Sequence, residues 1–157
     1  MSFGINLMLA ALWAALIGPF TPTNLLVGFV AGFLVLTLAA STGFNTGYPR
    51  RVVAIIVLAV FTIYELILAN FRVAWYTIST LRSLRPAILD VPLEPGMSDA
   101  EITLLSSLIT LTPGTLTLDV SNDRSILRVH FMHVEDPQAA IEDIKDGFER
   151  RVREATR

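Results

Sequence analysis

Residues 52–78 read VVAIIVLAVFTIYELILANFRVAWYTI and decide the architecture of this 157-residue chain. Only Glu65 and Arg72 are charged in this stretch, so it is apolar enough to enter a membrane. As an α-helix it would be about 40 Å long, against a hydrocarbon core of about 30 Å, so it must tilt or protrude. We therefore expect a membrane helix over about residues 52–80, with Glu65 at the midpoint of its apolar part.

Two further apolar stretches precede it, over residues 1–17 and 23–42, and residues 1–49 contain no charged side chain. Their helical lengths are about 25 Å and about 30 Å, so the first is short for a full crossing and the second just suffices. The turn between them carries two prolines, and Thr23 or Asn24 is expected to cap the second helix. A cleaved signal peptide would need a positively charged start, which is absent, so we expect the first stretch to be retained.

The first two stretches are expected to form a close antiparallel hairpin. Gly28 and Gly32 make a GxxxG pattern on the second helix, which permits close approach of two helix backbones. Chance occurrence in a membrane helix, where glycine is common, explains the pattern equally well.

Charge divides the chain at about residue 86. Residues 1–86 carry five arginines and one glutamate, net +4, whereas residues 87–157 carry seven basic and thirteen acidic side chains, net −6. This division predicts a membrane region over 1–86 joined to a water-soluble domain over 87–157. The acidic balance of the second part argues against nucleic acid as a partner, and the absence of cysteine excludes a disulfide framework and thiolate chemistry.

The arginines that flank the third apolar stretch leave its orientation open. Arg50 and Arg51 precede it, and Arg82 and Arg85 follow it. The positive-inside rule therefore draws both ends toward the cytoplasm, and one pair lies on the unfavoured side if the helix spans. A shallow first hairpin that does not cross fully would relieve this conflict, so two or three membrane helices are compatible with the charges.

Three polar side chains interrupt the third apolar stretch. Glu65 and Arg72 share a helix face, but their separation of about 10.5 Å along the axis is too large for easy direct pairing. Asn70 lies on a different face. A central carboxylate is costly unless it is paired, protonated or facing water, so these residues indicate either an ion or proton path or a polar contact between subunits. The lack of a relay of further titratable groups in the stretch favours the subunit contact.

Residues 87–157 show strand and helix patterns in the order β-α-β-β-α, which predicts a small α+β domain. Ser98 and Glu101 form a capping box at the start of its first helix. In the next segment, residues 115–120, apolar and polar residues alternate with period two. This pattern predicts a strand with three apolar side chains that face the core. These residues are Leu116, Leu118 and Val120.

The last helix is expected to begin at Asp136-Pro137, as N-cap and first helical residue. Its acidic side chains are expected to form a solvated face. They are Glu142, Asp143, Asp146 and Glu149.

Candidate catalytic groups in this domain do not converge. His130 and His133 are three residues apart in a strand pattern, so they point to opposite faces and cannot share a metal ion. Ser106 and Ser107 lie in a helix without a nucleophile elbow, and no phosphate loop or metalloprotease motif occurs. We therefore expect no catalytic site, no metal site and no cofactor in this chain.

Residues 105–115 read LSSLITLTPGT, and this run resembles the signature segment of the E subunit of Mrp-type multisubunit Na⁺/H⁺ (cation/proton) antiporters. The resemblance extends over the whole chain, including the Asp136-Pro137 helix start and the apolar N-terminal half. It implies an accessory, non-catalytic subunit of a bacterial inner-membrane complex that exchanges external protons for internal Na⁺. The implied partners are the other antiporter subunits and the lipid bilayer, and the implied placement is multi-pass with a cytoplasmic C-terminal domain.

Within the signature run, Thr112, Pro113, Gly114 and Thr115 are expected to form a structural turn, because proline stops the helix and glycine permits a positive φ. Two other functional classes stay open at this point. The chain could serve a related membrane-bound hydrogenase complex, or it could be a stand-alone membrane-anchored binding module. The proteins that co-purify with it would separate the three.

Overall fold

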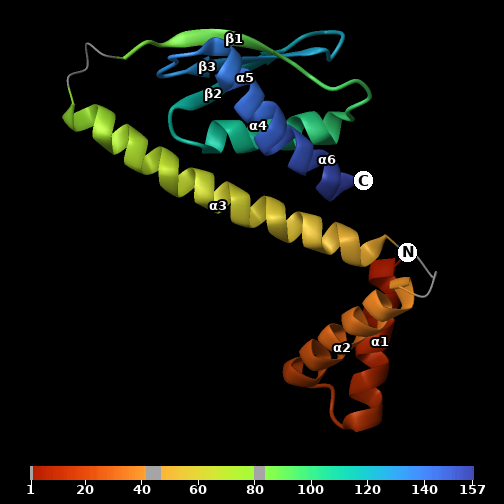
Figure 1. Cartoon of the computed structure of the whole chain (residues 1–157). Coiled ribbons are helices and arrows are strands. Elements are labelled where there is room, and N and C mark those ends of the chain that lie inside the picture. The colour runs from red at the N-terminus through yellow and green to blue at the C-terminus, as the bar shows by residue number, and fades with distance from the viewer. Residues whose placement is uncertain (1, 42–46, 80–83) are drawn as a thin grey trace. The chain divides into compact units, whose positions relative to one another are not determined.

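A computed structural model describes residues 2–41, 47–79 and 84–157, and Figure 1 shows the helices and strands. Arg82 lies outside the described residues. The elements are α1 (Ser2–Ile17), α2 (Pro22–Ser41), α3 (Tyr48–Ile78), β1 (Ala87–Pro92), α4 (Asp99–Leu111), β2 (Thr115–Val120), β3 (Ile126–Phe131), α5 (Pro137–Glu142), η2 (Asp143–Glu149) and α6 (Arg150–Thr156). The expected combination of apolar N-terminal helices with a small α+β domain is confirmed.

The chain forms two compact units, Met1–Val53 and Ala54–Arg157, and each is described by itself. The expected boundary between membrane region and soluble domain, at residues 86 and 87, falls inside the second unit and stays a prediction. The two compact units meet within α3, because α3 packs on the domain from Ala54 onward.

The first unit is a hairpin of α1 and α2, whose turn differs in one detail from the expectation. Thr21 caps α2, because its Oγ1 accepts a hydrogen bond from the Asn24 backbone N–H at 3.2 Å. The expectation of a cap at Thr23 or Asn24 was therefore wrong. Pro22 opens the helix, where its missing N–H costs nothing, and this moves the cap one residue earlier.

Polar side chains along α2 and α3 bond to the backbone of their own helix. Each donates to the carbonyl four residues earlier at 2.7 to 2.9 Å. The four are Thr37, Thr62, Asn70 and Thr77. Such bonds satisfy the donors without water, which suits helices in apolar surroundings.

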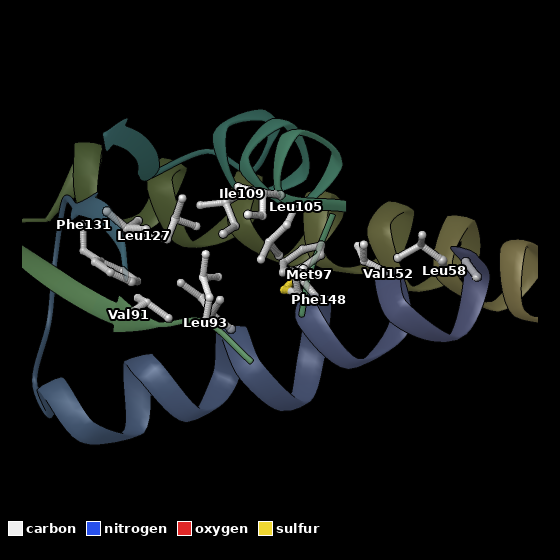
Figure 2. Packing of buried hydrophobic residues seen from close by; sticks show 14 of the residues in the cluster. Leu58, Val91, Leu93, Met97, Leu105, Ile109, Leu127, Phe131, Phe148 and Val152 are labelled. Carbon is white, nitrogen blue, oxygen red and sulfur yellow. The ribbon is translucent and has the colours of Figure 1, made fainter. Parts of the chain in front are cut away.

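The second unit is built on a three-stranded antiparallel sheet in the order β1-β3-β2. Segments α5, η2 and α6 follow one another without a break and are called the C-terminal helix here. Helix α4 and the C-terminal helix cover one face of this sheet (Figure 1). Figure 2 shows the core between them, where strand residues meet both helices. Its labelled members include Val91, Leu127 and Phe131 from strands, Leu105 and Ile109 from α4, and Phe148 and Val152 from the C-terminal helix. Leu58 of α3 belongs to the same core, so α3 contributes directly to the packing of the domain.

Strand β2 has the opposite orientation from the one its alternation predicts. Leu116 and Leu118 are 45% and 46% exposed, and only Val120 packs against the core as expected. Thr117 faces α4, because its N–H donates to Thr110 Oγ1 at 3.2 Å and its hydroxyl donates to the Ser106 carbonyl at 3.3 Å. An irregularity between Thr117 and Asp119 then shifts the register and returns Val120 to the core.

The last helix begins as expected, with Asp136 accepting from the N–H groups of Gln138 and Ala139. Its middle segment, Asp143–Glu149, is a π-helix, which has a wider turn than the α-helix. This turn carries Glu149 inward, where it is 1% exposed, so its expected place on a solvated face was wrong. Glu149 accepts from the Glu94 N–H at 2.6 Å and from Lys145 Nζ at 3.3 Å, so its charge is well satisfied.

Glu101 is a second buried carboxylate, 4% exposed, and it closes the expected capping box. Its Oε2 accepts from the Ser98 N–H at 2.7 Å, while Oε1 accepts from Thr156 Oγ1 at 2.7 Å and Arg157 Nε at 3.2 Å. These donors, the Ser98 N–H first among them, lower the pKa of Glu101 from 4.5 to about 2. Glu101 therefore ties the start of α4 to the end of α6.

We expect Glu101→Gln to lower the free energy of unfolding of the domain by about 2 kcal/mol at pH 7, because hydrogen bonds to a charged acceptor are lost. The pKa of Glu101 is lower in the folded state than in the unfolded state, so its contribution is full above about pH 5 and is lost toward pH 2. Urea unfolding followed by far-UV circular dichroism of the detergent-solubilised chain measures both effects.

The difference between wild type and Glu101→Gln should shrink steadily between pH 5 and pH 2. Glu142→Gln is the matched control, because Glu142 is exposed and its carboxylate accepts a hydrogen bond from the nearby Gln138 side chain. A difference that stayed constant over this pH range would contradict the role assigned to the Glu101 carboxylate.

Candidate functional site

A hollow of about 530 Å³ lies in the second unit, between α3 and the α+β domain. Glu65 and Arg72 line it from α3, and the whole turn at residues 112–115 lines it from the domain. Charged side chains of the C-terminal helix complete the wall, namely Asp143, Asp146, Arg150 and Arg151. The structure therefore brings together two groups of candidates that lie far apart in the sequence.

Phe61 fixes α3 against the domain beside this hollow. Its ring centroid lies 5.2 Å from that of Phe148 in an edge-on arrangement, and the guanidinium carbon of Arg151 lies 3.8 Å from the Phe61 centroid. Gly147 permits this approach, because a Cβ there would lie 3.2 Å from Phe61 Cζ. Arg151 Nη1 also donates to the carbonyls of Asp146 and Gly147, so the guanidinium is held over the ring.

Glu65 is half-buried and Arg72 is exposed, and both line the hollow beside Phe61. Neither makes an ion pair of 4 Å or less with another described residue. The opposite wall holds two acidic and two basic side chains, so Glu65 faces a polar space formed by its own chain. This space reduces the cost of a carboxylate at the midpoint of an apolar helix.

Asn70 does not belong to this site. Its side chain is exposed, and its Nδ2 donates to the Leu66 carbonyl at 2.7 Å. The amide donor is therefore satisfied by its own helix, away from Glu65 and Arg72.

The turn at residues 112–115 is held by hydrogen bonds from both of its threonines. Thr115 Oγ1 lies 2.6 Å from the Ile109 carbonyl and 2.9 Å from the Thr112 carbonyl, and Thr112 Oγ1 donates to Leu108. Gly114 has φ +94°, a region that residues with a side chain rarely adopt. The Gly114 carbonyl also accepts from the Met132 N–H at 2.8 Å, which ties the turn to the end of β3.

His133 makes contacts in the second unit that the sequence patterns did not predict. Its Nδ1 accepts from the Arg85 N–H at 3.1 Å, and its ring lies 5.1 Å from that of Tyr76. It therefore joins the start of the domain to α3 and lines the hollow. His130 faces away from the core on β3, opposite Ile88 in the sheet register.

The glycine pair Gly28 and Gly32 lies in the first unit, against α1. A Cβ on Gly28 would lie 2.8 Å from Trp13 Cβ, and one on Gly32 would collide with Asn6 Oδ1. Asn6 is fully buried, and its Nδ2 donates to the Tyr48 hydroxyl at 3.1 Å. Sequence reasoning missed Asn6, although a lone amide in a charge-free helix is a recognisable signal of a helix contact.

These features define a class of protein. Helices α2 and α3 are long and apolar enough to cross a membrane, and they precede a small domain with a well-formed core. Among the described residues, no group of three or more His, Cys, Asp or Glu side chains could hold a metal ion. The arrangement is that of a small α+β domain joined to apolar helices that are able to anchor it in a membrane.

Comparison with known proteins identifies the family. A model of the family described as Na⁺/H⁺ ion antiporter subunit matches residues 6–155. The chain is 38% identical over 154 residues to the E subunit of the Na⁺/H⁺ antiporter of Alkalihalophilus pseudofirmus, covering 98% of this chain and 96% of the relative. It is also 38% identical over 153 residues to the E subunit of the Na⁺/H⁺ antiporter of Bacillus subtilis, with the same two coverages. The chain belongs to the family of Na⁺/H⁺ antiporter E subunits, whose members are transporter subunits rather than enzymes.

Two solved structures are similar to this chain. One belongs to the Mrp complex from Dietzia sp., with TM-score 0.52 and 29% identity, covering 66% of this chain and 96% of that chain. The other belongs to the membrane-bound sulfane sulfur reductase, an archaeal respiratory membrane complex, with TM-score 0.58 and 25% identity, covering 97% and 96%. The resemblance carried by residues 105–115 is thereby confirmed, and the family places the chain in a membrane.

We expect Gly114→Val to reduce the amount of assembled complex, because a branched side chain at φ +94° costs about 1 to 3 kcal/mol. Space is not the reason, since a Cβ would lie 3.6 Å from the nearest atom of Val73. Gly114→Asn should retain more complex than Gly114→Val, because asparagine tolerates positive φ better. Native gels of solubilised membranes measure the yield, and full assembly of Gly114→Val with loss of transport would point to a direct functional role instead.

Proposed function

We propose that this chain is an accessory, non-catalytic subunit of a multisubunit monovalent cation/proton antiporter, and that it supports assembly and Na⁺/H⁺ exchange. The observation that carries the proposal is the 38% identity to two Na⁺/H⁺ antiporter E subunits along nearly the full length of each chain. The similarity to a chain of the Mrp complex supports it further. Its partners are the other antiporter subunits and the bilayer. Na⁺ and protons are transported by the complex as a whole.

The placement in this proposal is a bacterial inner membrane, multi-pass, with the C-terminal domain in the cytoplasm. Arg82 and Arg85 follow the last apolar helix, and the positive-inside rule favours the cytoplasm for such residues. The seven basic and thirteen acidic side chains after residue 86 suit an aqueous compartment.

Within the proposal, the candidate residues have structural roles. Glu65 and Arg72 line the hollow and stabilise a contact with a neighbouring subunit, and Asn70 lies outside the hollow. The turn at residues 112–115 shapes the domain side of the same hollow. Gly28 and Gly32 permit close packing of α1 on α2.

A second candidate is a subunit of a respiratory membrane complex. The similarity to the sulfane sulfur reductase chain covers 97% of this chain and favours that possibility. The identity is 25% in that case and 38% for the antiporter subunits, so the antiporter is the stronger proposal.

Affinity purification of the tagged chain from its own membranes, followed by mass spectrometry, tests the proposal. An antiporter subunit should bring several other apolar membrane subunits and no bound redox metal. Nickel, iron or flavin in the purified complex would identify a hydrogenase or respiratory assembly. A chain that purifies alone in mild detergent would be a stand-alone module.

We expect Glu65→Gln to leave complex yield and exchange largely intact, because glutamine keeps the shape and hydrogen-bonding capacity of the side chain. Glu65→Ala should lower the yield, because alanine removes both the charge and the hydrogen-bonding capacity proposed to hold a neighbouring subunit. Asn70→Ala is the control with little effect, since the Asn70 amide donates to the Leu66 carbonyl of its own helix. Complex yield is measured beside Na⁺-driven proton flux in vesicles, and an assembled but inactive Glu65→Gln complex would instead indicate an ion path through Glu65.

A further inference from the structure

We propose that α3 does not cross the bilayer but lies along its surface, with one face in the lipid and the other against the α+β domain. That α3 lies on the cytoplasmic side of the bilayer rests on the placement proposed above. That α3 lies in the plane of the bilayer rests only on the packing of α3 against the domain. The proposal names lipid, at the boundary between headgroups and hydrocarbon, as the occupant of the free face of α3.

The contact between α3 and the domain lies in the middle of the helix. A crossing takes about 20 helical residues, and any 20-residue window of Tyr48–Ile78 contains both Phe61 and Glu65. Phe61 is the residue that packs on Phe148 and carries Arg151 over its ring. A spanning α3 would therefore bring Arg151 and its charged neighbours into the hydrocarbon, at several kcal/mol for each charge.

Helix α3 has one face toward the domain and an apolar face opposite to it. The residues that touch the domain or line the hollow include Leu58, Phe61, Glu65, Arg72 and Tyr76, at helical spacing. The opposite face carries no charge. It consists of large apolar side chains that are 51% to 79% exposed, namely Ile56, Val60, Ile63, Ile67, Phe71 and Ile78.

This face runs for about 33 Å at 1.5 Å per residue, which is too long and continuous to be left in water. Asn70 lies beside it and satisfies its amide donor on the helix itself. Trp75, 65% exposed, lies toward the end of the helix, and tryptophan favours the interface between lipid and water. An amphipathic helix with these properties lies in the plane of the membrane.

Arginines lie at or near both ends of α3. Arg50 and Arg51 lie in the first turn of α3, and Arg85 follows it closely in the sequence. For a spanning helix, the positive-inside rule can be met at one end only. For a helix in the surface, both ends lie on the same side, and the arginines at both ends can meet anionic headgroups.

The first test labels single cysteines with a membrane-impermeant maleimide in spheroplasts and in inverted vesicles, with the complete complex present. The chain has no cysteine of its own, so Arg50→Cys and Ser79→Cys report the two ends of α3. Asn122→Cys reports the domain, and it is preferred to Asp123, whose carboxylate bonds to Ser125. We expect all three to be labelled in inverted vesicles and protected in spheroplasts.

Labelling of Arg50→Cys and Ser79→Cys from opposite sides would overturn the in-plane helix and leave the proposed function untouched. Labelling of all three in spheroplasts would support the in-plane helix and overturn the cytoplasmic placement. The two proposals therefore fail separately.

The second test identifies what covers the free face. A photo-crosslinking amino acid replaces Ile63 or Phe71 in the assembled complex, and the products are analysed by mass. We expect lipid adducts at both positions and none from Glu142, an exposed residue of α5. Crosslinks to another subunit at both positions would overturn lipid as the occupant.

Discussion

The packing of Phe61 and Leu58 against the C-terminal helix determines how the second unit can meet a membrane. Each aromatic or cation–π contact contributes about 0.5 to 2 kcal/mol, and Leu58 adds the burial of a whole aliphatic side chain. Together they make α3 part of the core of a domain whose outer surface is charged. The apolar helix is stable in lipid and the charged domain is stable in water. The interface between them must therefore lie at the boundary between the bilayer and the aqueous phase.

The order of elements in the domain could be read from the sequence because the α-helical and strand periods differ clearly. The starts of α4 and α5 were also predictable, because the capping residues Ser98 and Asp136 accept hydrogen bonds from backbone N–H groups within the next three residues. The errors at Leu116, Leu118 and Glu149 have a different origin. An irregularity in β2 changes which face its side chains occupy, and a π segment in the last helix changes the direction of the side chains that follow. A regular period read from the sequence cannot reveal either change.

The candidate site was predictable in its parts and not in its assembly. Glu65 and Arg72 were visible as charges in an apolar stretch, and Gly114 was visible as turn chemistry. Their meeting in one hollow depends on a contact between residues about 90 positions apart, Phe61 and Phe148, which no local pattern encodes. His133 and Asn6 were missed because a single polar residue signals a role only when its neighbours in space are known.

The π segment Asp143–Glu149 also sets how long this part of the chain can be. A π turn holds more residues than an α turn, so it absorbs the equivalent of an insertion without breaking the helix. Deletion of one residue here would close the wide turn to an ordinary α turn, so the helix could continue in register. Val152 and Ala155 would then keep their places in the core, whereas a deletion at the start of Arg150–Thr156 would rotate the residues that follow by about 100°. The π segment is therefore the part of this helix where a change of one residue in length should be tolerated best.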